Sequence, residues 1–518
     1  MTPTPARSPI RTQNAPERVT GVQLMQGIGA RPAVGFWTDA WRTIVRRRAA
    51  VAAMCWIGVV AFFAVFAPII ASGHPLWMKH LGSGKITSPL WNHLNAVDLV
   101  LLVWGLIAIP YVGFGPSVGR GRRAWTMIGA LVVAIVVLAV SGVLQGRLEN
   151  QAQQQARAAS SAAARGLETA AGAVRPFARR PGSGYIVGLG VGAAVFGAVM
   201  ALPMGRPGRR AAVAGIAVLV SGAAVGARWS PPLEIHNYIQ RELSGEVEAK
   251  YTLIPWSPLQ RDSALDRREP MTRYGSASRL DPSSAPYGRT YILGTDAFGQ
   301  DVLTQLLHAC RLAISIGLVS TSVALIIGVT MGALMGYFGG WVDLALYRLV
   351  EVFMAVPVLF LLIVAVAVLP EELRNTYVIM GIIGCFTWTG MARFTRAEFL
   401  KLRNQDFVQA AQAAGLPLRS ILFRHMLPNG IAPVLVDTSF AIAAAISVEA
   451  TLSFLGLGPV DSASWGRLLS SAISSEGEFK WWLAVFPGLA IFLTVLSYNL
   501  IGEALRDAID PKLKKARV

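Results

Sequence analysis

The polar connection between two long apolar runs reads Asp406-Phe-Val-Gln-Ala-Ala-Gln-Ala-Ala-Gly415-Leu-Pro-Leu-Arg-Ser-Ile-Leu-Phe-Arg-His-Met-Leu-Pro-Asn429. Its residues predict a short alanine-rich helix, a break at Gly415, a second short amphipathic helix and a stop at the final Leu-Pro pair. Glycine tolerates the positive φ that ends a helix, and Pro417 suits a first helical turn. Apolar side chains such as Phe423 need a partner surface in such a connection. Docking of another protein and packing on the chain's own helices explain these residues equally well.

Apolar runs dominate the rest of the chain. Of its 518 residues, 53% are hydrophobic and 15% are charged, whereas soluble domains carry about 25% charged residues. About 20 helical residues cross the hydrocarbon core of a membrane, which is ~30 Å thick. Ten candidate membrane runs follow from this length: 51–71, 97–114, 125–144, 185–204, 211–227, 312–338, 346–369, 377–392, 431–457 and 483–501. The predicted fold class is all-α, a polytopic transmembrane helix bundle.

Basic residues indicate how these runs are oriented. Lys and Arg number 47 against 29 Asp and Glu, and the net charge of +18 would suit either a nucleic-acid partner or basic cytoplasmic loops. The arginines cluster between apolar runs, which favours the loops and predicts no nucleic-acid partner. Arginines 46–48 place the N-terminus in the cytoplasm. Alternating spans then place the basic segments 120–123, 206–210, 393–424 and 512–515 there too, and only the stretch 145–184 does not conform.

The sequence contains no complete motif for catalysis or metal binding. Three cysteines, Cys55, Cys310 and Cys385, form no CxxC pair and predict neither a disulfide framework nor a zinc site. The G-x-S-x-G match at 115–119 lacks a strand-turn-helix context, and the P-loop fragment at 82–85 lacks its other residues. No HExxH occurs. We therefore predict no catalytic residue, no metal and no cofactor bound by this chain.

The 406–429 stretch resembles the EAA loop of binding-protein-dependent ABC transporter permeases, with Ala410, Ala411, Gly415, Leu427 and Pro428 at the positions of that pattern. Further motifs, in the same order, resemble the C-type subunit of dipeptide/oligopeptide permeases. They are Leu293-Gly-Thr-Asp296…Gly299, Gly336-Tyr-Phe-Gly-Gly-Trp-Val-Asp343, Arg424-His-Met-Leu-Pro-Asn429, Leu452-Ser-Phe-Leu-Gly-Leu-Gly458, Ser464-Trp-Gly466, Phe486-Pro-Gly488 and Leu505-Arg-Asp507. The resemblance covers about 285–512 and 41–70.

The resemblance implies a MetI-like ABC permease core of about six spans in the cytoplasmic (inner) membrane of a prokaryote, with both termini cytoplasmic. It implies import of peptides or a related small solute, alongside a second permease subunit, two cytoplasmic ABC ATPase subunits and an extracytoplasmic solute-binding protein. ATP and Mg would bind to the ATPases, so the chain itself is predicted to be no enzyme. The residues expected to contact an ATPase are Phe407, Gln409, Ala410, Ala411, Ala414, Gly415, Arg419, His425, Leu427 and Pro428.

Two kinds of departure from the family pattern stand out. Gln409 replaces the EAA glutamate, and Gln300 replaces the arginine of a Gly-Arg-Asp motif. About four spans are inserted after the first one, with no role given by the resemblance. The predicted divisions are a cytoplasmic segment 1–50, a first span 51–71, an inserted region 72–228, an extracytoplasmic loop 229–305 and a permease core 306–511 with the coupling loop at about 398–430.

Three further features leave alternatives open. Glu449 lies in the middle of a span, where a charge costs roughly 2.5–3.5 kcal/mol to insert, so it either lines a solute pathway or is paired structurally. Glycines 328, 332, 336 and 340 share one helix face and suit packing within the subunit, or less well between subunits. An ion-coupled secondary transporter would need more buried charges and an internal repeat, and a membrane hydrolase would need a catalytic cluster.

Overall fold

The computed structural model describes residues 36–114 except 95, parts of 129–140 and 213–225, 183–201, and 238–509 with short gaps. These gaps are 262–264, 274–288, 371–373, 375, 460–461 and 474–476. Several predicted features lie outside the described residues: most of the run 125–144, the stretch 145–182, the basic loops 120–123 and 206–210, and the lysines of 512–515.

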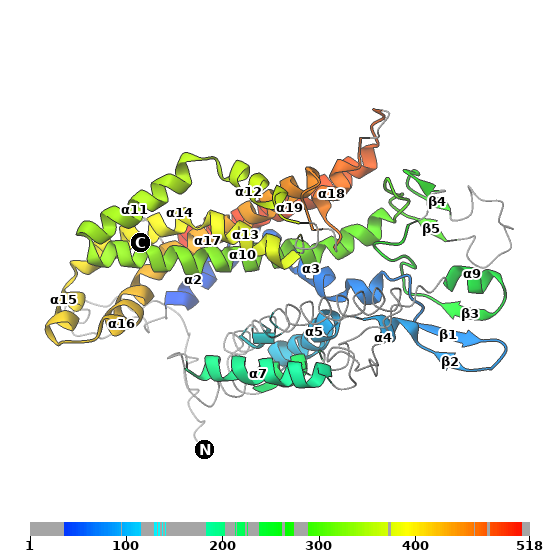
Figure 1. Cartoon of the computed structure of the whole chain (residues 1–518), viewed down its shortest axis with the longest axis horizontal. Coiled ribbons are helices and arrows are strands. Elements are labelled where there is room, and N and C mark those ends of the chain that lie inside the picture. Colours follow the sequence, from blue (N-terminus) through cyan, green and yellow to red (C-terminus); the bar gives the residue numbers. More distant parts are fainter. Residues whose placement is uncertain are drawn as a thin grey trace, which may run out of the picture.

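Long helices run side by side through the centre of the molecule (Figure 1). The longest, α10 (Val302–Phe338), packs most extensively on α14 (Thr389–Arg403). It also contacts α13 (Thr376–Thr387), α3 and α17. Its 37 residues extend about 55 Å at 1.5 Å per residue, farther than a hydrocarbon core requires. Its neighbours are α3 (Arg48–Ile70), α17 (Leu427–Phe454) and α19 (Trp481–Ile509), with the short α2 (Phe36–Val45) on α19.

Two predicted spans are bent helix pairs. α11 (Gly340–Ala355) and α12 (Val358–Ala367) meet at 78° on either side of Pro357, which restricts the residue before it and offers no N–H. α13 (Thr376–Thr387) and α14 (Thr389–Arg403) meet at 44°. The described residues therefore contain four candidate membrane spans, or up to six if each bent pair is one span, at the places of the six predicted core runs.

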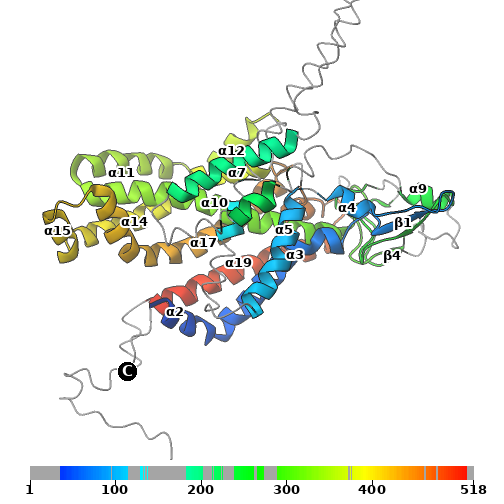
Figure 2. The ribbon, with the colours of Figure 1, turned by 90° about the horizontal axis from the view of Figure 1, so that it is seen from below.

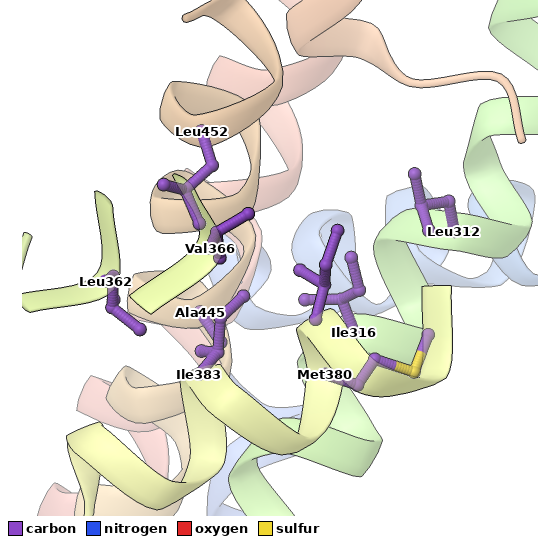
Figure 3. Close-up of a cluster of buried hydrophobic side chains, with 9 residues drawn as sticks. Leu312, Ile316, Leu362, Val366, Met380, Ile383, Ala445 and Leu452 are labelled. Carbon is purple, nitrogen blue, oxygen red and sulfur yellow. The ribbon is translucent and has the colours of Figure 1, made fainter. Parts of the chain in front are cut away.

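The largest buried apolar cluster joins four of these helices. Figure 3 shows its side chains meeting between α10, α12, α13 and α17. Ile316 and Ile383 are fully buried there, as are Leu362 and Leu452. Because the bent pairs contribute to this cluster, their bends are fixed by packing as well as by local sequence.

The inserted helices form a second cluster beside the bundle. α5 (Ala96–Phe114) and α7 (Ser183–Ala201) lie along one side of it in Figure 1, and α5 packs against α3 (Figures 1 and 2). Their buried side chains meet those of the helical segments within 129–140 and 213–225, and the shared set includes Val100, Ala134 and Ala217. The region therefore has an apolar core of its own.

Short strands correct the all-α prediction, although the protein is mostly helical. β1 (Trp77–His80) lies between β2 (Ile86–Thr87) and β3 (Val247–Lys250) in an antiparallel sheet. This sheet lies at the end of the molecule opposite α15 (Asp406–Ala413) (Figure 1). This sheet joins residues that precede the inserted helices to residues that follow them. The remaining short elements are α4 (Pro89–His93), α9 (Tyr238–Leu243), β4 (Thr272–Arg273), β5 (Thr290–Tyr291) and α18 (Trp465–Ser470).

Candidate coupling site

The chain after α14 folds into a helical hairpin, residues 404–429, at one end of the bundle (Figure 1). Its first arm, α15 (Asp406–Ala413), begins with an acidic residue, which suits the positive end of the helix dipole. Val408 and Ala411 share one face of α15 and are buried. The polar and alanine side chains between them are exposed, so α15 packs through a narrow stripe.

Gly415 ends α15 as the sequence predicted. Its φ is +69°, its N–H donates to the Gln412 carbonyl at 2.9 Å, and the Leu416 N–H donates to the Ala411 carbonyl at 3.2 Å. These two bonds define a Schellman motif, in which glycine supplies the left-handed residue. No atom lies within 4 Å of the place of a Cβ at Gly415, so glycine is required there by backbone conformation and not by space.

The return arm corrects the predicted stop at Leu427-Pro428. After α16 (Leu418–Ser420), the chain continues as a π-helix, η4 (Ile421–Met426), directly into α17. The Leu427 N–H bonds to the Leu422 carbonyl, five residues back. The wider turn of the π-helix changes the bonding pattern just where Pro428 has no N–H to give, and the helix passes through the proline unbroken.

The inner face of the hairpin is fixed to the ends of α10 and α14. Val408, Ile421 and Met426 pack with Phe399 of α14 in one buried cluster. Gln412 Nε2 also donates to the Tyr337 hydroxyl of α10 at 3.3 Å. The hairpin is therefore anchored to both α10 and α14.

The outer face of the hairpin exposes apolar side chains. Phe423 is 59% exposed, and Phe407, Leu416 and Leu418 are each between 38% and 39% exposed. This surface, defined by these four side chains, is the candidate coupling surface. Of the predicted contact residues, Phe407, Gln409, Ala410, Ala414, Gly415, Arg419 and Pro428 are exposed, and His425 and Leu427 are half-buried.

Ala411 does not lie on this surface. It is 6% exposed and belongs to the hairpin's own buried cluster. Since Val408 and Ala411 are three residues apart, they point to the same inward face of α15. A charge placed at Ala411 would disrupt the hairpin itself and would not report on an interface.

The glycine ladder joins α10 to α14 within the subunit. A Cβ at Gly332 would lie 2.5 Å from the Ala392 carbonyl oxygen, and one at Gly328 would lie 2.8 Å from that of Trp388. Both are closer than atoms can approach, so only glycine permits this seam. Gly340, the fourth predicted member, begins α11 and has open space around it.

An ion pair joins α11 to α14 beside these glycines. Arg396 of α14 donates to both carboxylate oxygens of Asp343 on α11, at 2.5 and 2.7 Å.

Glu449 is held in a closed polar cluster. Its Oε1 accepts hydrogen bonds from Ser453 Oγ at 2.6 Å and Ser464 Oγ at 2.8 Å, and the residue is 3% exposed. Ser464 Oγ also accepts from the Gly466 N–H, at the start of α18. Of the two interpretations left open by the sequence, structural pairing fits this geometry better than a pathway role.

Buried acids also lie at the N-terminal end of α10. Asp301 caps the helix, since its Oδ2 accepts from the Thr304 N–H and hydroxyl at 2.8 and 2.7 Å. Burial raises the pKa of Asp301 from 3.8 to about 6, while these hydrogen bonds favour its ionised form. Nearby Asp296 accepts from the Gln300 N–H and from Gln305 Nε2. Gln300 itself is buried, at 3% exposure.

Sequence reasoning missed the ion pairs that join distant helices. Besides Asp343–Arg396, they are Arg47–Asp507, between α2–α3 and α19, and Asp98–Arg311, between α5 and α10. Asp98 is the single charge in the run 97–114, and Arg311 directly precedes the run 312–338. A lone charge in an apolar run is itself a signal of pairing. Among the described residues, no group of three or more His, Cys, Asp and Glu could hold a metal ion.

Comparisons with known proteins agree with this architecture. Residues 328–515 match the binding-protein-dependent transport system inner membrane component family, and residues 35–80 match the N-terminal transmembrane domain of oligopeptide transport permease C. The dipeptide transport system permease DppC of Alkalihalophilus pseudofirmus is 36% identical over 248 residues, covering 47% of this chain and 80% of the relative. The inner membrane ABC transporter permease YejE of Escherichia coli is 40% identical over 290 residues, 55% of this chain and 83% of the relative.

These matches, with the helical bundle and the hairpin, define an integral membrane component of a transport system. The chain belongs to the family of inner-membrane permeases of binding-protein-dependent ABC importers. It is a multi-pass, non-catalytic subunit that works with ATPase and solute-binding partners. This excludes the secondary-transporter and hydrolase alternatives. Residues 81–327 lie outside both family matches and include the inserted helices.

Proposed function

We propose that this chain is the C-type permease subunit of a peptide importer, and that an ATPase subunit docks on the candidate coupling surface. The observation that carries the proposal is the two-sided hairpin. Its inner face is packed on α10 and α14, while Phe407, Leu416, Leu418 and Phe423 are exposed on its outer face. Exposed apolar side chains on a polar connection mark a protein interface.

Movement of an ATPase would reach the membrane helices through rigid contacts. The glycine seam between α10 and α14 leaves no space for the two helices to slide, and Arg396–Asp343 ties α11 to the same seam. A shift of the hairpin would therefore move three helices together. Transport also requires two conformations with different solute affinity, which ATP binding and hydrolysis in two ATPase subunits would alternate.

The solute class is supported by the relatives. The names of matched permeases specify dipeptide, oligopeptide and glutathione transport, the last for GsiD of Pectobacterium atrosepticum at 38% identity over 75% of that relative. All three solutes contain peptide bonds. A second, related permease subunit would complete the pathway, and an extracytoplasmic binding protein would deliver the peptide. ATP and Mg would bind in the ATPases and not in this chain.

The proposed topology has a MetI-like core of about six spans and about four inserted spans, with both termini and the hairpin cytoplasmic. The divisions at 1–50, 51–71, 72–228, 229–305 and 306–511 follow from it. The sheet supports one adjustment, because β1 and β2 pair with β3 outside the inserted helices. The insertion proper would then begin near Leu94 and end near Tyr238.

Cysteine labelling in a background without the three native cysteines tests this topology. A cysteine near Ser284 that reacts only with reagent on the cytoplasmic side would contradict it.

Substitution of Gly415 tests the hairpin by conformation alone. Valine there must adopt a left-handed conformation that costs roughly 1–2 kcal/mol, whereas asparagine tolerates it and serves as the matched control. We expect Gly415→Val to reduce peptide uptake by up to about tenfold, while Gly415→Asn keeps most of it and both proteins reach the membrane. Equal uptake by Gly415→Val and the wild type would refute a coupling role for this turn.

A further inference from the structure

One ion pair joins the inserted helices to the permease core. Asp98, near the start of α5, accepts a hydrogen bond from Arg311 Nη1 of α10. The Asp98 side chain is 10% exposed and that of Arg311 is 25% exposed. Arg311 Nε donates at 2.9 Å to the Ala64 carbonyl of α3. The guanidinium therefore lies where α3, α5 and α10 meet.

The position of this pair along the helices is deep. Ala64 lies six residues before the end of α3, a rise of about 9 Å. α3 is apolar and long enough to cross a membrane, so the Ala64 carbonyl lies within a candidate membrane span. A cation at this depth is costly without a partner, and removing one member of a buried pair leaves the other uncompensated.

The same face of α5 packs closely on α3. A Cβ at Gly105 would lie 2.9 Å from Val65 Cγ1 and 3.3 Å from the Phe66 ring, so glycine permits this approach. His308, one turn before Arg311, lies 2.8 Å from the Ala71 carbonyl through its Nε2. The contact therefore combines a charge pair with close apolar packing over about two turns of α5.

We propose that Asp98 supplies the counter-charge that Arg311 requires, so that the permease core depends on the inserted helices as long as it carries Arg311, and that these helices dock where α3 and α10 meet. The insertion has its own apolar core, as an added unit should, but the core's Arg311 depends on it. The remainder of the chain is then not a complete permease as it stands. This proposal needs neither the solute class nor the coupling role of the hairpin.

Deletion of the inserted helices offers a direct test. Leu90 N–H bonds to the Pro75 carbonyl, and the rings of His74 and Tyr238 are 5.6 Å apart, so a short linker can join Leu94 to Tyr238. We expect this deletion to be recovered as folded protein in detergent only when it also carries Arg311→Met. Equal recovery of the deletion with Arg311 intact would overturn the proposal.

Full-length variants test the same pair without a deletion. Asp98→Leu should lower the midpoint of thermal unfolding, and Asp98→Leu combined with Arg311→Met should restore most of the loss, because two apolar side chains can replace a buried pair. Glu246→Ala, which breaks the exposed pair with Arg241, is the control and should change little. A midpoint for Asp98→Leu equal to that of the control would contradict the proposal.

Cross-linking reports the docking itself. Gly105→Cys and Val65→Cys place two thiols at the α5–α3 contact, in a background whose native Cys55, Cys310 and Cys385 are replaced by alanine. We expect an efficient disulfide in the otherwise unaltered chain and little after Asp98→Leu. An undiminished disulfide after Asp98→Leu would show that the charge pair does not hold the insertion in place.

Discussion

Two helix pairs in this chain approach each other through glycines spaced by four. In the core, Cβ atoms at Gly328 and Gly332 of α10 would collide with backbone carbonyls of α14 at 2.8 and 2.5 Å. In the insertion, a Cβ at Gly188 of α7 would lie 3.1 Å from the Gly222 carbonyl, and one at Gly192 would meet the side chain of Val218. Similar sequence patterns therefore produce seams of different tightness.

The difference follows from what each seam supports. In the α10–α14 seam an added Cβ would meet backbone oxygens at 2.5 and 2.8 Å, and the ends of these two helices hold the hairpin. In the α7 seam the backbone contact is longer, at 3.1 Å, and the shortest contact is with the Val218 side chain, so an added methyl group should cost less there. Tight backbone contact is thus found where we propose that movement is transmitted, and adjustable contact where the helices only need to assemble.

Breaking the core seam should have the largest effect. Gly336→Val places a branched side chain against the Phe399 Cβ and within 2.8 Å of the Arg396 carbonyl oxygen. We expect a loss of more than about 3 kcal/mol of stability, at the upper end for overpacking, and loss of folded permease on size-exclusion chromatography. Gly381→Val, at a helical glycine of α13 with open space around it, is the control. Similar behaviour of the two variants would mean that the seam is not tight.

Titration of Asp301, at the N-terminal end of α10, tests a second feature of the core. The pKa of Asp301 is raised to about 6 in the folded protein, so between about pH 4 and 6 the native state holds a proton that the unfolded state has lost. Stability should therefore fall as the pH rises through this window, by at most about 3 kcal/mol.

Asp301→Asn removes the titrating group and keeps a side-chain oxygen as helix cap. We expect the thermal midpoint of this variant to lose the part of its pH dependence that lies between about pH 4 and 6. An unchanged pH profile would assign the dependence to other groups.

Substitutions in the insertion should have the smallest effect. Gly188→Ala would place a Cβ 3.1 Å from the Gly222 carbonyl, so the two backbones must separate by a few tenths of an ångström, and the helix preference of alanine, roughly 1 kcal/mol, offsets this cost. Stability should therefore change by less than about 1 kcal/mol. Gly190→Ala, which points into open space, should stabilise slightly. If Gly188→Ala were as damaging as Gly336→Val, the two seams would be equally tight and the comparison would fail.

Hydropathy predicted the places of the core helices well, because membrane thickness dictates the length of an apolar run. It did not predict that α10 begins at Val302, ten residues before its apolar run. Thr304 and Gln305 are buried there by contacts with Asp301 and Asp296 that hydropathy cannot register. The run 346–369 was predicted as one continuous span, yet the chain bends at Pro357. The stop predicted at Pro428 is absent, because a π-helix accommodates that proline.

The position of the hairpin 404–429 was predicted from the sequence, and its detail only in part. The turn at Gly415 follows from residue type, since few other residues tolerate its φ. Which alanines of α15 point inward depends on how α15 packs against Phe399 and Met426, and composition alone cannot show it. The pairing of Asp98 with Arg311 spans 213 positions in the chain and is a property of the fold.

Co-purification of the ATPase subunits tests the central claim most directly. Phe423→Asp puts a charge on the most exposed apolar residue of the coupling surface, and Leu253→Asp does the same at an 86% exposed leucine outside the hairpin. A desolvated, unpaired carboxylate costs several kcal/mol, so we predict that Phe423→Asp loses both bound ATPase and peptide uptake while Leu253→Asp keeps them. A folded Phe423→Asp permease that retains its full complement of ATPase and full uptake would contradict docking at this surface.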